Sequence, residues 1–388
     1  MPKFPLLLPI FLFATPLWAD ERPLKQTPAP ATAIAHVDLD GQTARQVVVD
    51  REKGQYLGHP TTLLLEDGKT ILCVYPKGHG KGAILYKRSA DGGRTWSDRL
   101  PTPKNWETSL ETPTLHRVVD AAGKKRVILF SGLYPVRTAV SDDDGQTWSE
   151  LKPVGDWGGI VAMGSVVELK TAPGRYMALF HDDGRFIKQG GKAAGVFTLY
   201  KSLSSDGGLT WAAPQAIFTA TDVYLCEPGA VRSPDGKQIA VLLRENRRVK
   251  NSHIIFSDDE GETWTTPREL PATLNGDRHT CKYAPDGRLF VSFRDGPAKG
   301  KPSPTAGDWV GWVGTYDDLV KGRDGQYRIR LKKNHHGWDC AYPGVELLPD
   351  GTFVVTTYGH WTPNEPPYIL SVRFTLPEID DLAKAIRN

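Results

Sequence analysis

SADGGRTW, at residues 89–96, returns three more times along the chain, as SDDDGQTW at 141–148, SSDGGLTW at 204–211 and SDDEGETW at 257–264. The shared pattern S-x-D-x-G-x-T-W is that of a tight turn between two strands. In such a turn the Asp accepts hydrogen bonds from the backbone, the Gly supplies a positive φ, and the Trp packs beneath the turn. The motif therefore predicts a structural clamp on four β-hairpins, not a catalytic site.

A looser repeat occurs six times and predicts the number of structural units. In each copy an apolar, β-prone run reaches a turn, usually Asp-Gly, and a second apolar run follows. The copies are residues 63–74, 117–130, 165–180, 230–243, 282–293 and 345–357. Hairpins that recur along a whole chain indicate a repeat architecture. The sequence therefore predicts an all-β, six-bladed β-propeller.

The last two blades are predicted to complete their sheets without the clamp motif. Residues 310–316 and 326–331 read as the outer strands of the fifth blade. Residues 368–376 leave the sixth blade one strand short. We expect the N-terminal run 45–50 to supply that strand and close the ring, so that the first and last blades have no unpaired edge. The tail, 376–388, reads as a short helix.

The overall composition is that of a globular protein with 39 Gly, 30 Pro and a net charge of +3. No basic stripe is present, which argues against a nucleic-acid partner. The mild positive balance suits an anionic small substrate. The even number of cysteines permits two disulfides in an exported protein, and their spacing matches no zinc motif. These cysteines are Cys73, Cys226, Cys281 and Cys340.

The N-terminus resembles an export signal. Residues 1–19 contain a basic residue, an apolar core and a small residue before Asp20, which predicts a cleavable signal peptide and a secreted or periplasmic protein. The apolar run is too short and too interrupted by proline for a membrane span, although an uncleaved anchor is the alternative. Residues 20–35 read as a Pro/Ala-rich linker, and 36–388 as a single propeller domain.

Propeller geometry predicts where a site would lie. The first strand of every blade starts, and the second ends, at the same end of the ring near its axis. The predicted starts are His59, Glu111, Gly159, Glu227, His279 and Tyr342. The predicted ends are Lys77, Tyr134, His181 with Asp182, Arg244, Arg294 and His360. The sequence therefore predicts a polar pocket on one face, unless these loop ends are simply polar.

The four clamps are identified as Asp boxes, and the chain resembles the sialidase superfamily over essentially all of its predicted mature length. The Asp box is shared by many proteins that are not sialidases, so it indicates fold and not activity. Sialidases hold a sugar carboxylate with three arginines, use a Tyr activated by a Glu as nucleophile, and use an Asp as acid/base. Arginine matches a carboxylate bidentately, and a neutral Tyr avoids repulsion with it.

Three parts of that pattern have counterparts here. Glu227, within LCEPG, resembles the family's Glu-Pro in the fourth blade. Tyr342, within DCAYP, lies where the nucleophile belongs. Arg244 corresponds to the arginine at the end of the following strand, and Arg294 or Arg278 to the third arginine. The alternatives are salt-bridge roles for Glu227 and Arg244 and a packing role for Tyr342.

Two parts of the pattern are missing. The family opens its first blade with Arg-Ile-Pro, whereas this chain reads YLGHP, with His59 near the expected arginine. The family's acid/base Asp lies in the loop after the second strand, whereas residues 75–82, YPKGHGKG, contain no carboxylate. Lys77 and His79 of that loop are predicted to bind an anionic group. We expect His59, His79 or Asp339 to act as the proton donor.

Other polar residues are predicted to contact substrate at the same face. These are Arg278, His279, His181, Asp182, Asp339 and His360. No pair of histidines has a typical ligand spacing, so the sequence predicts neither a metal nor another cofactor. Sugar stacking is a possible role for Trp309, Trp338 and Trp361, and rim packing is the alternative.

Three functions fit these observations. The first is a secreted glycoside hydrolase that cleaves an acidic sugar, sialic acid or a uronic or sulfated relative. The second is a polysaccharide lyase in which a His or Tyr removes the proton beside a uronate carboxylate. The third is a glycan-binding propeller without turnover. The sequence favours the hydrolase, because so many ionisable groups are unusual in a pure binding protein.

Overall fold

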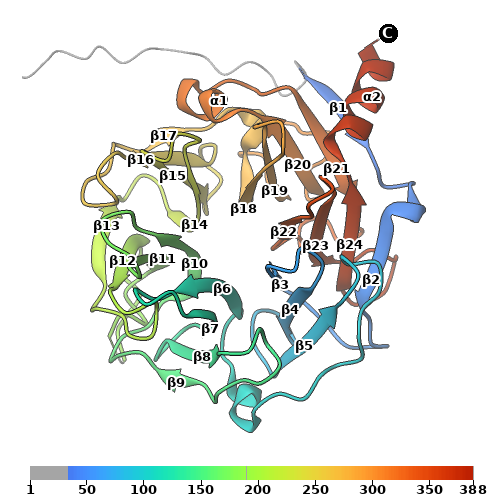
Figure 1. The fold of residues 1–388 in the computed structure, drawn as a ribbon. Helices are drawn as coiled ribbons and strands as arrows, with labels where there is room; N and C mark the ends of the chain where they lie inside the picture. The colour runs from blue at the N-terminus through green and yellow to red at the C-terminus, as the bar shows by residue number, and fades with distance from the viewer. Residues whose placement is uncertain (1–33, 189, 388) are drawn as a thin grey trace, which may run out of the picture.

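The computed structural model describes residues 34–188 and 190–387, and they form a ring of six antiparallel inner hairpins and their outer strands around one axis (Figure 1). The predicted all-β, six-bladed β-propeller is confirmed. Blade one has three strands, β3 (Thr61–Leu64), β4 (Ile71–Pro76) and β5 (Ile84–Ser89). Blade two has four, β6 (Thr114–Val119), β7 (Lys125–Ser131), β8 (Arg137–Ser141) and β9 (Lys152–Pro153).

Blades three and four repeat the four-stranded order. Blade three contains β10 (Ile160–Glu168), β11 (Tyr176–Asp182), β12 (Thr198–Ser204) and β13 (Gln215–Thr219). Blade four contains β14 (Leu225–Arg232), β15 (Ile239–Glu245), β16 (His253–Ser257) and β17 (Arg268–Glu269). All six inner hairpins fall where the looser repeat predicted them.

The N-terminal segment contributes to the last two blades. Blade five contains β18 (Gly276–Tyr283), β19 (Leu289–Asp295), β20 (Trp309–Gly314), β21 (Tyr327–Lys332) and β1 (Ala35–Asp38), which runs parallel to β21. Blade six contains β22 (Gly344–Leu347), β23 (Phe353–Gly359), β24 (Tyr368–Phe374) and β2 (Gln46–Asp50), which pairs antiparallel to β24. The predicted closure by residues 45–50 is confirmed, and β1 is an additional strand that the sequence did not predict.

Short helices connect or flank the blades. They are η1 (Thr43–Arg45), η2 (Lys104–Thr108), η3 (Ala272–Leu274), α1 (Tyr316–Lys321) and α2 (Leu376–Arg387). The predicted C-terminal helix is α2, which lies beside β1. None of the helices in the described residues is long and apolar enough to cross a membrane. The predicted signal peptide, 1–19, and residues 20–33 of the predicted linker lie outside the described residues, and Ala35, the last linker residue, begins β1.

The Asp boxes act as the turn clamps that the sequence predicted. In the first, Asp91 accepts hydrogen bonds from the backbone nitrogen of Thr95 at 2.9 Å and from its hydroxyl at 2.6 Å. Gly93 has a φ of 77°, and its nitrogen donates to the hydroxyl of Ser89 at 2.7 Å. The same bonds from Thr to Asp and from Gly to Ser recur in the other three boxes.

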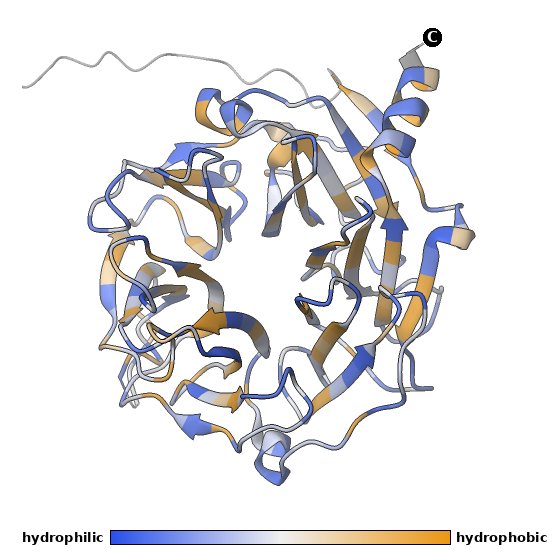
Figure 2. Ribbon diagram, in the orientation of Figure 1, coloured by the Kyte–Doolittle hydropathy of each residue, from blue (hydrophilic) through white to orange (hydrophobic). Residues whose placement is uncertain are grey.

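The apolar core lies between blades, not on the axis. Between blades five and six, for example, the rings of Phe290 and Phe353 lie 5.0 Å apart, and Phe374 packs against both. Comparable clusters fill the other interfaces, and Figure 2 shows hydrophobic residues concentrated on the strands. The four cysteines are unpaired. This division of the core leaves the axis free for polar side chains.

Candidate functional site

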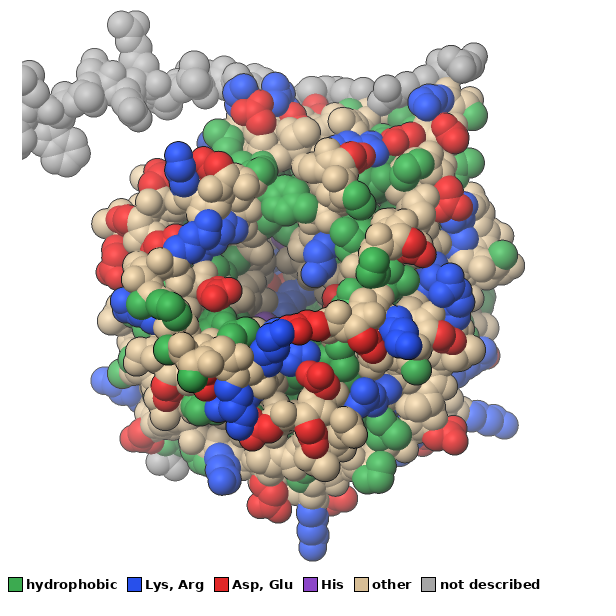
Figure 3. All heavy atoms as spheres, viewed as in Figure 1, with side chains coloured by type: hydrophobic (Ala, Val, Ile, Leu, Met, Phe, Trp, Pro, Cys, Tyr) green, Lys and Arg blue, Asp and Glu red, His purple; other side chains and the backbone are tan. Residues whose placement is uncertain are grey.

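One face of the ring is hollowed at its centre, and basic and histidine side chains are visible inside the hollow (Figure 3). The backbone is strained at a set of positions where the inner strands begin. His59, Val161, Glu227, Arg278 and Ala341 all have φ between 46° and 60°. Positive φ in residues other than glycine is unfavourable and concentrates at functional sites. The strain therefore marks this end of the blades as the candidate site.

The centre of the site is a contact between blades four and six. The Tyr342 hydroxyl donates a hydrogen bond to Glu227 Oε1, and Arg244 Nη1 donates to the same oxygen at 2.6 Å. Burial and the neighbouring Glu227 raise the pKa of Tyr342 well above its usual value. Burial is the largest influence and would raise the pKa of Glu227, but Arg244, the Tyr342 hydrogen bond and Arg294 together outweigh it and lower that pKa. At neutral pH the pair is therefore a phenol facing a carboxylate.

A second buried carboxylate, Asp277, fixes the arginines around this pair. It lies 3.1 Å from Arg244 Nε, and it accepts hydrogen bonds from Arg248 Nη2 at 2.6 Å and Arg294 Nε at 2.8 Å. Burial opposes ionisation, but Arg244 and the other arginines lower the pKa of Asp277. Arg294 also donates to the carbonyl of Cys340 at 3.1 Å. Asp277 was not among the predicted site residues, although its neighbour Arg278 was.

Arg278 differs from these arginines because its buried Nη1 has no hydrogen-bond partner within the described residues. Its guanidinium lies 5.8 Å from the centre of the Tyr342 ring, and burial lowers its pKa. Arg244, Arg248, Arg278 and Arg294 thus face the carboxylates Glu227 and Asp277. On this side of the pocket the arginines outnumber the ionised carboxylates Glu227 and Asp277, which favours an anionic ligand.

Glu111 is a site residue that the sequence reasoning placed at the pocket but assigned no role. Its Oε1 accepts a hydrogen bond from the Thr112 nitrogen at 2.7 Å. A Cβ placed on Gly80 would lie 3.0 Å from the same oxygen, so the carboxyl packs against the loop 77–82. Burial, with a contribution from Glu227, raises the pKa of Glu111. A loop without carboxylates therefore receives one from the neighbouring blade.

Asp339 is the centre of the opposite side of the pocket. Tyr56 donates to its two oxygens, each at 3.0 Å, and Tyr358 donates at 3.1 Å. His360 Nε2 lies 3.3 Å from Asp339 Oδ2, and His79 Nδ1 lies 3.5 Å from Oδ1. His79 is also 2.6 Å from the Tyr56 hydroxyl, and its side chain is 58% exposed. Three of the predicted residues, His79, Asp339 and His360, therefore lie together.

His59 is buried and uncharged at neutral pH. Its Nδ1 accepts a hydrogen bond from the nitrogen of Gly80 at 3.1 Å, and its Nε2 lies 3.2 Å from the Tyr358 hydroxyl. Burial, with His79 and two arginines nearby, holds the pKa of His59 well below its usual range. A neutral imidazole therefore stands where the family has an arginine, and it is poorly suited to donate a proton.

Two predicted substrate-binding residues are engaged elsewhere. Lys77 Nζ lies 3.1 Å from Glu52 Oε1, in a group with Asp50 and Arg99. Asp182 Oδ2 accepts backbone hydrogen bonds from Gly184, Phe186 and Ile187, at 2.7, 3.2 and 3.2 Å. Lys77 thus forms a surface ion pair, and Asp182 organises the loop that follows β11.

His181 and His279 support the pocket wall. The nitrogen of Glu227 donates to His181 Nδ1 at 3.4 Å, and burial lowers the pKa of His181 to about 4. His279 Nε2 donates to the carbonyl of Leu274 at 2.8 Å, and its ring stacks on Phe293. Both histidines are therefore buried neutral groups that position the backbone of β14 and η3.

The tryptophans divide into two groups. Trp309 and Trp361 are buried and lie 5.7 Å apart between ring centres, so they have the packing role. Trp338 is 62% exposed, and the Arg294 guanidinium lies 6.0 Å from its ring centre. Trp338 is thus the one of the three that is free to stack on a ligand.

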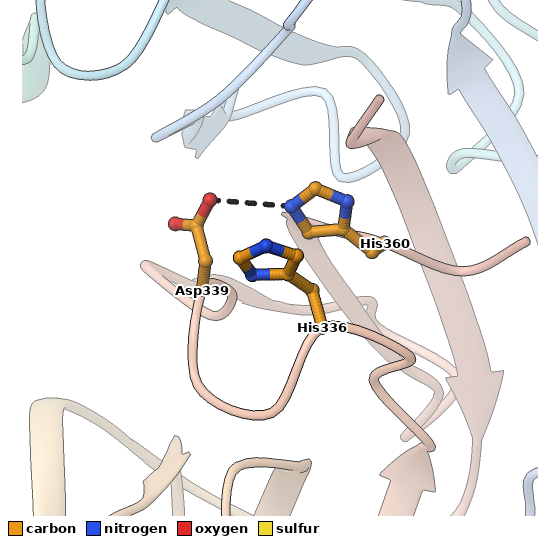
Figure 4. Close-up of side chains that lie close together, drawn as sticks. All are labelled: His336, Asp339 and His360. Atoms are coloured by element: carbon orange, nitrogen blue, oxygen red, sulfur yellow. Dashed lines mark hydrogen bonds and ion pairs between the residues drawn. The ribbon is translucent and has the colours of Figure 1, made fainter. Parts of the chain in front are cut away.

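In the loop that carries Trp338, His336 and Asp339 approach His360, and these three side chains have the donor atoms to hold a metal ion (Figure 4).

Known proteins resemble this chain in sequence and in fold. The family model described as the BNR repeat-like domain matches residues 29–291. A sialidase from Micromonospora viridifaciens is 26% identical over 376 residues, which cover 84% of this chain and 54% of that protein. The chain thus spans about half the length of this curated relative.

Solved structures share the propeller at low sequence identity. A protein of unknown function from Dyadobacter fermentans superposes with a TM-score of 0.65 at 16% identity, covering 85% of this chain and 97% of that one. The NanB sialidase of Streptococcus pneumoniae superposes with a TM-score of 0.60 at 13% identity, covering 86% of this chain and 71% of that one. The intramolecular trans-sialidase of Ruminococcus gnavus superposes with a TM-score of 0.56 at 15% identity, covering 83% of this chain and 95% of that one. These structures establish the fold.

Proposed function

Because the chain belongs to the BNR repeat-like domain family and shares its propeller fold with sialidases, we propose that it is a glycoside hydrolase that removes an acidic sugar from a glycan. Tyr342 is the nucleophile and Glu227 its base. The observation that carries the proposal is the Tyr342–Glu227 hydrogen bond, buried beside Arg244. A tyrosine needs such a base because its phenol is otherwise a weak nucleophile.

The arginines determine the class of substrate. Arg244 and Arg294 are held in place by Asp277, and Arg278 has an unpartnered donor. Together they bind the carboxylate or sulfate of the sugar, since guanidinium donors match such groups bidentately. The substrate is sialic acid or a uronic or sulfated relative, and the sialidase relative supports the first of these.

The reaction proceeds in two displacements. Glu227 accepts the phenolic proton as the Tyr342 oxygen attacks the anomeric carbon and the glycosidic bond breaks. A protonated acid donates its proton to the departing oxygen, and a glycosyl–tyrosine remains. In the second step that acid, now a base, takes a proton from water, the water oxygen replaces tyrosine, and Glu227 returns its proton to Tyr342.

Glu111 is the acid in this scheme. Its raised pKa favours the protonated form that the first step needs, and it lies between the loop 77–82 and the Glu227 site. His59 is neutral, and His79 is exposed and bonded to Tyr56. A buried carboxyl with a raised pKa is the usual acid of glycosidases.

The first experiment compares wild type with Tyr342→Phe on a 4-methylumbelliferyl sialoside and on uronic and sulfated polysaccharides. We expect turnover to fall by more than about 1000-fold, because a phenylalanine has no attacking oxygen. Tyr316→Phe is the control, since this tyrosine of α1 donates to Gln238 beside the β14–β15 turn, at the opposite end of the inner hairpin from the pocket. Full activity of Tyr342→Phe would overturn the proposal. A product that absorbs in the ultraviolet would indicate a lyase, and binding without turnover would indicate a lectin.

The second experiment tests the acid with Glu111→Gln. We expect kcat/KM to fall by about 100- to 10,000-fold, and the alkaline limb of its pH profile to disappear. A substrate with a good leaving group should recover most of the rate, because it needs no proton. Glu107→Gln, an exposed carboxyl in η2, is the control. An unchanged pH profile would assign the acid to another group, with His79 the next to test.

The proposal includes export, which the N-terminal sequence supports through its basic residue, apolar core and small residue at position 19. Expression in a bacterial host followed by N-terminal sequencing of the exported protein tests it. We expect the mature chain to begin near Asp20. Retention of an intact residue 1 in the cell would contradict it.

A further inference from the structure

A group of three side chains at the pocket mouth has no part in the proposed reaction. His336 and Asp339 lie in the loop before β22, and His360 follows β23. One ligand atom of each lies within 4.8 Å of those of the other two (Figure 4). The histidines approach the carboxylate from two segments of chain, which is why no short spacing in the sequence pointed to them.

The hydrogen bond behind His360 sets the direction of its lone pair. Its Nδ1 lies 3.0 Å from the carbonyl oxygen of Glu365, and because a carbonyl only accepts, Nδ1 carries the proton. In neutral imidazole Nε2 is then an acceptor, yet it faces Asp339 Oδ2, another acceptor, at 3.3 Å. Two acceptors at this distance need a proton or a cation between them. A backbone carbonyl on the far nitrogen is also the usual arrangement of a metal-binding histidine.

Asp339 is oriented in a similar way. Its side chain is only 9% exposed, and Tyr358 donates to Oδ1 at 3.1 Å. Tyr56 donates to both oxygens of the carboxylate, each at 3.0 Å. These bonds hold Oδ2 toward His360. Partners that fix the orientation of a carboxylate raise its affinity for a metal.

His336 completes the group from the solvent side. It is exposed and lies three residues before Asp339, and its ring stacks on that of His360 at 4.3 Å. It can therefore rotate toward an ion without disturbing the core. Two imidazoles and one carboxylate favour Zn²⁺ and similar first-row divalent ions, whereas Mg²⁺ and Ca²⁺ prefer oxygen ligands.

We infer that His336, Asp339 and His360 form a binding site for a first-row divalent transition metal, with Zn²⁺ the best match. Three protein ligands leave a zinc ion a fourth position for water or a ligand oxygen. The ion ties the loop that carries Trp338 to the end of β23. This site does not depend on the proposed hydrolysis.

The experiment is a Zn²⁺ titration of the untagged protein by calorimetry, after dialysis against a chelator. Wild type should bind a single Zn²⁺ and no Ca²⁺. His336→Ala and His360→Ala should bind Zn²⁺ more than about 100-fold more weakly, since the loss of even an outer partner costs 10- to 100-fold. If His360→Ala fails to fold, the test rests on His336→Ala, because His336 is exposed and its replacement leaves the core intact.

Two controls separate this inference from others. His335→Ala, which removes an adjacent exposed histidine that bonds to His360 only through its backbone, should bind Zn²⁺ like wild type. Tyr342→Phe should also bind it normally, so that failed hydrolysis and failed metal binding remain distinguishable. The absence of Zn²⁺ uptake by wild type would overturn the site and identify His360 with Asp339 as an ion pair. Equal uptake by His336→Ala and His360→Ala would overturn it as well.

Discussion

The pocket has two sides that handle charge in different ways. The arginine side, from blades four and five, places fixed positive charges around two ionised carboxylates; it consists of Glu227, Arg244, Arg248, Asp277, Arg278 and Arg294. The histidine side, from blades six and one, gathers aromatic and imidazole groups around a single carboxylate; it consists of Tyr56, His59, His79, Asp339, Tyr358 and His360.

This difference separates what the chain shares with sialidases from what it does not. The resemblance to sialidases rests mainly on the arginine side, through Glu227 and Arg244, together with Tyr342. The histidine side replaces the first arginine by His59 and the loop carboxylate by His79. The proposed anion binding thus rests on arginines, which keep their charge at every physiological pH. The histidine side instead carries groups that can coordinate a metal ion, and the proposed acid, Glu111, comes from neither side.

The largest effect is expected when the arginine side loses its counter-charge. Asp277 is fully buried and is shared by Arg244, Arg248 and Arg294. Asp277→Asn should lower the free energy of unfolding by about 3–5 kcal/mol, because it leaves buried cations unpaired. Urea unfolding measures this loss.

The control is Asp286→Asn, whose partner Arg288 lies at the surface turn of blade five. It should cost less than about 1 kcal/mol. Equal costs for the two variants would mean that the arginines are held by groups other than Asp277.

A smaller effect on binding, with none on folding, is expected for Arg278→Met. Arg278 is buried without a partner for Nη1, so its loss removes no hydrogen bond at that atom and relieves burial of a charge. Stability should be unchanged or higher. Affinity for an acidic monosaccharide should fall about 10- to 100-fold, or about 1.4–2.8 kcal/mol. Calorimetric titration with Arg137→Met as the control measures it, and unaltered affinity would exclude Arg278 from the anion site.

The fold was predictable because its determinants are local. Asp91 and Gly93 form their bonds within one turn, and the same four-residue relation recurs in each Asp box. Strand β2 was found because blade six lacked a partner for β24. Strand β1 was missed, since its short run AHVD has too few apolar residues to stand out and instead packs against β21 and α2.

The site was only partly predictable because its contacts join distant blades. Tyr342 and Glu227 were found through resemblance, and blade geometry brought both to one face. Asp277 gave no separate signal, because only the fold shows that one carboxylate serves three arginines. Lys77 lies at the end of a second strand, as Arg294 does, yet its side chain pairs with Glu52. A strand-end position fixes where a residue lies, not the direction of its side chain.

The smallest effect concerns His59, and it tests whether the histidine side is uncharged. The folded state holds the pKa of His59 below that of the unfolded chain. Above about pH 6.5 neither state binds this proton, so stability does not change with pH at this position. As the pH falls below that value, the unfolded state takes up a proton that the folded state excludes. Stability is then lost by up to about 1.4 kcal/mol per pH unit.

His59→Asn removes the pH-dependent loss of stability at this position. The difference in unfolding free energy between wild type and variant should therefore shrink as the pH falls from 7.5 to 5. His335→Asn, an exposed histidine, should show no such convergence. Urea unfolding at several pH values measures both. Parallel curves would mean that the folded protein protonates His59 as readily as the unfolded chain does. A difference that grows as the pH falls would mean that folding favours the imidazolium, which would then take the place of the family's first arginine. Converging curves would mean that His59 is neutral in the folded protein and adds no positive charge to the pocket.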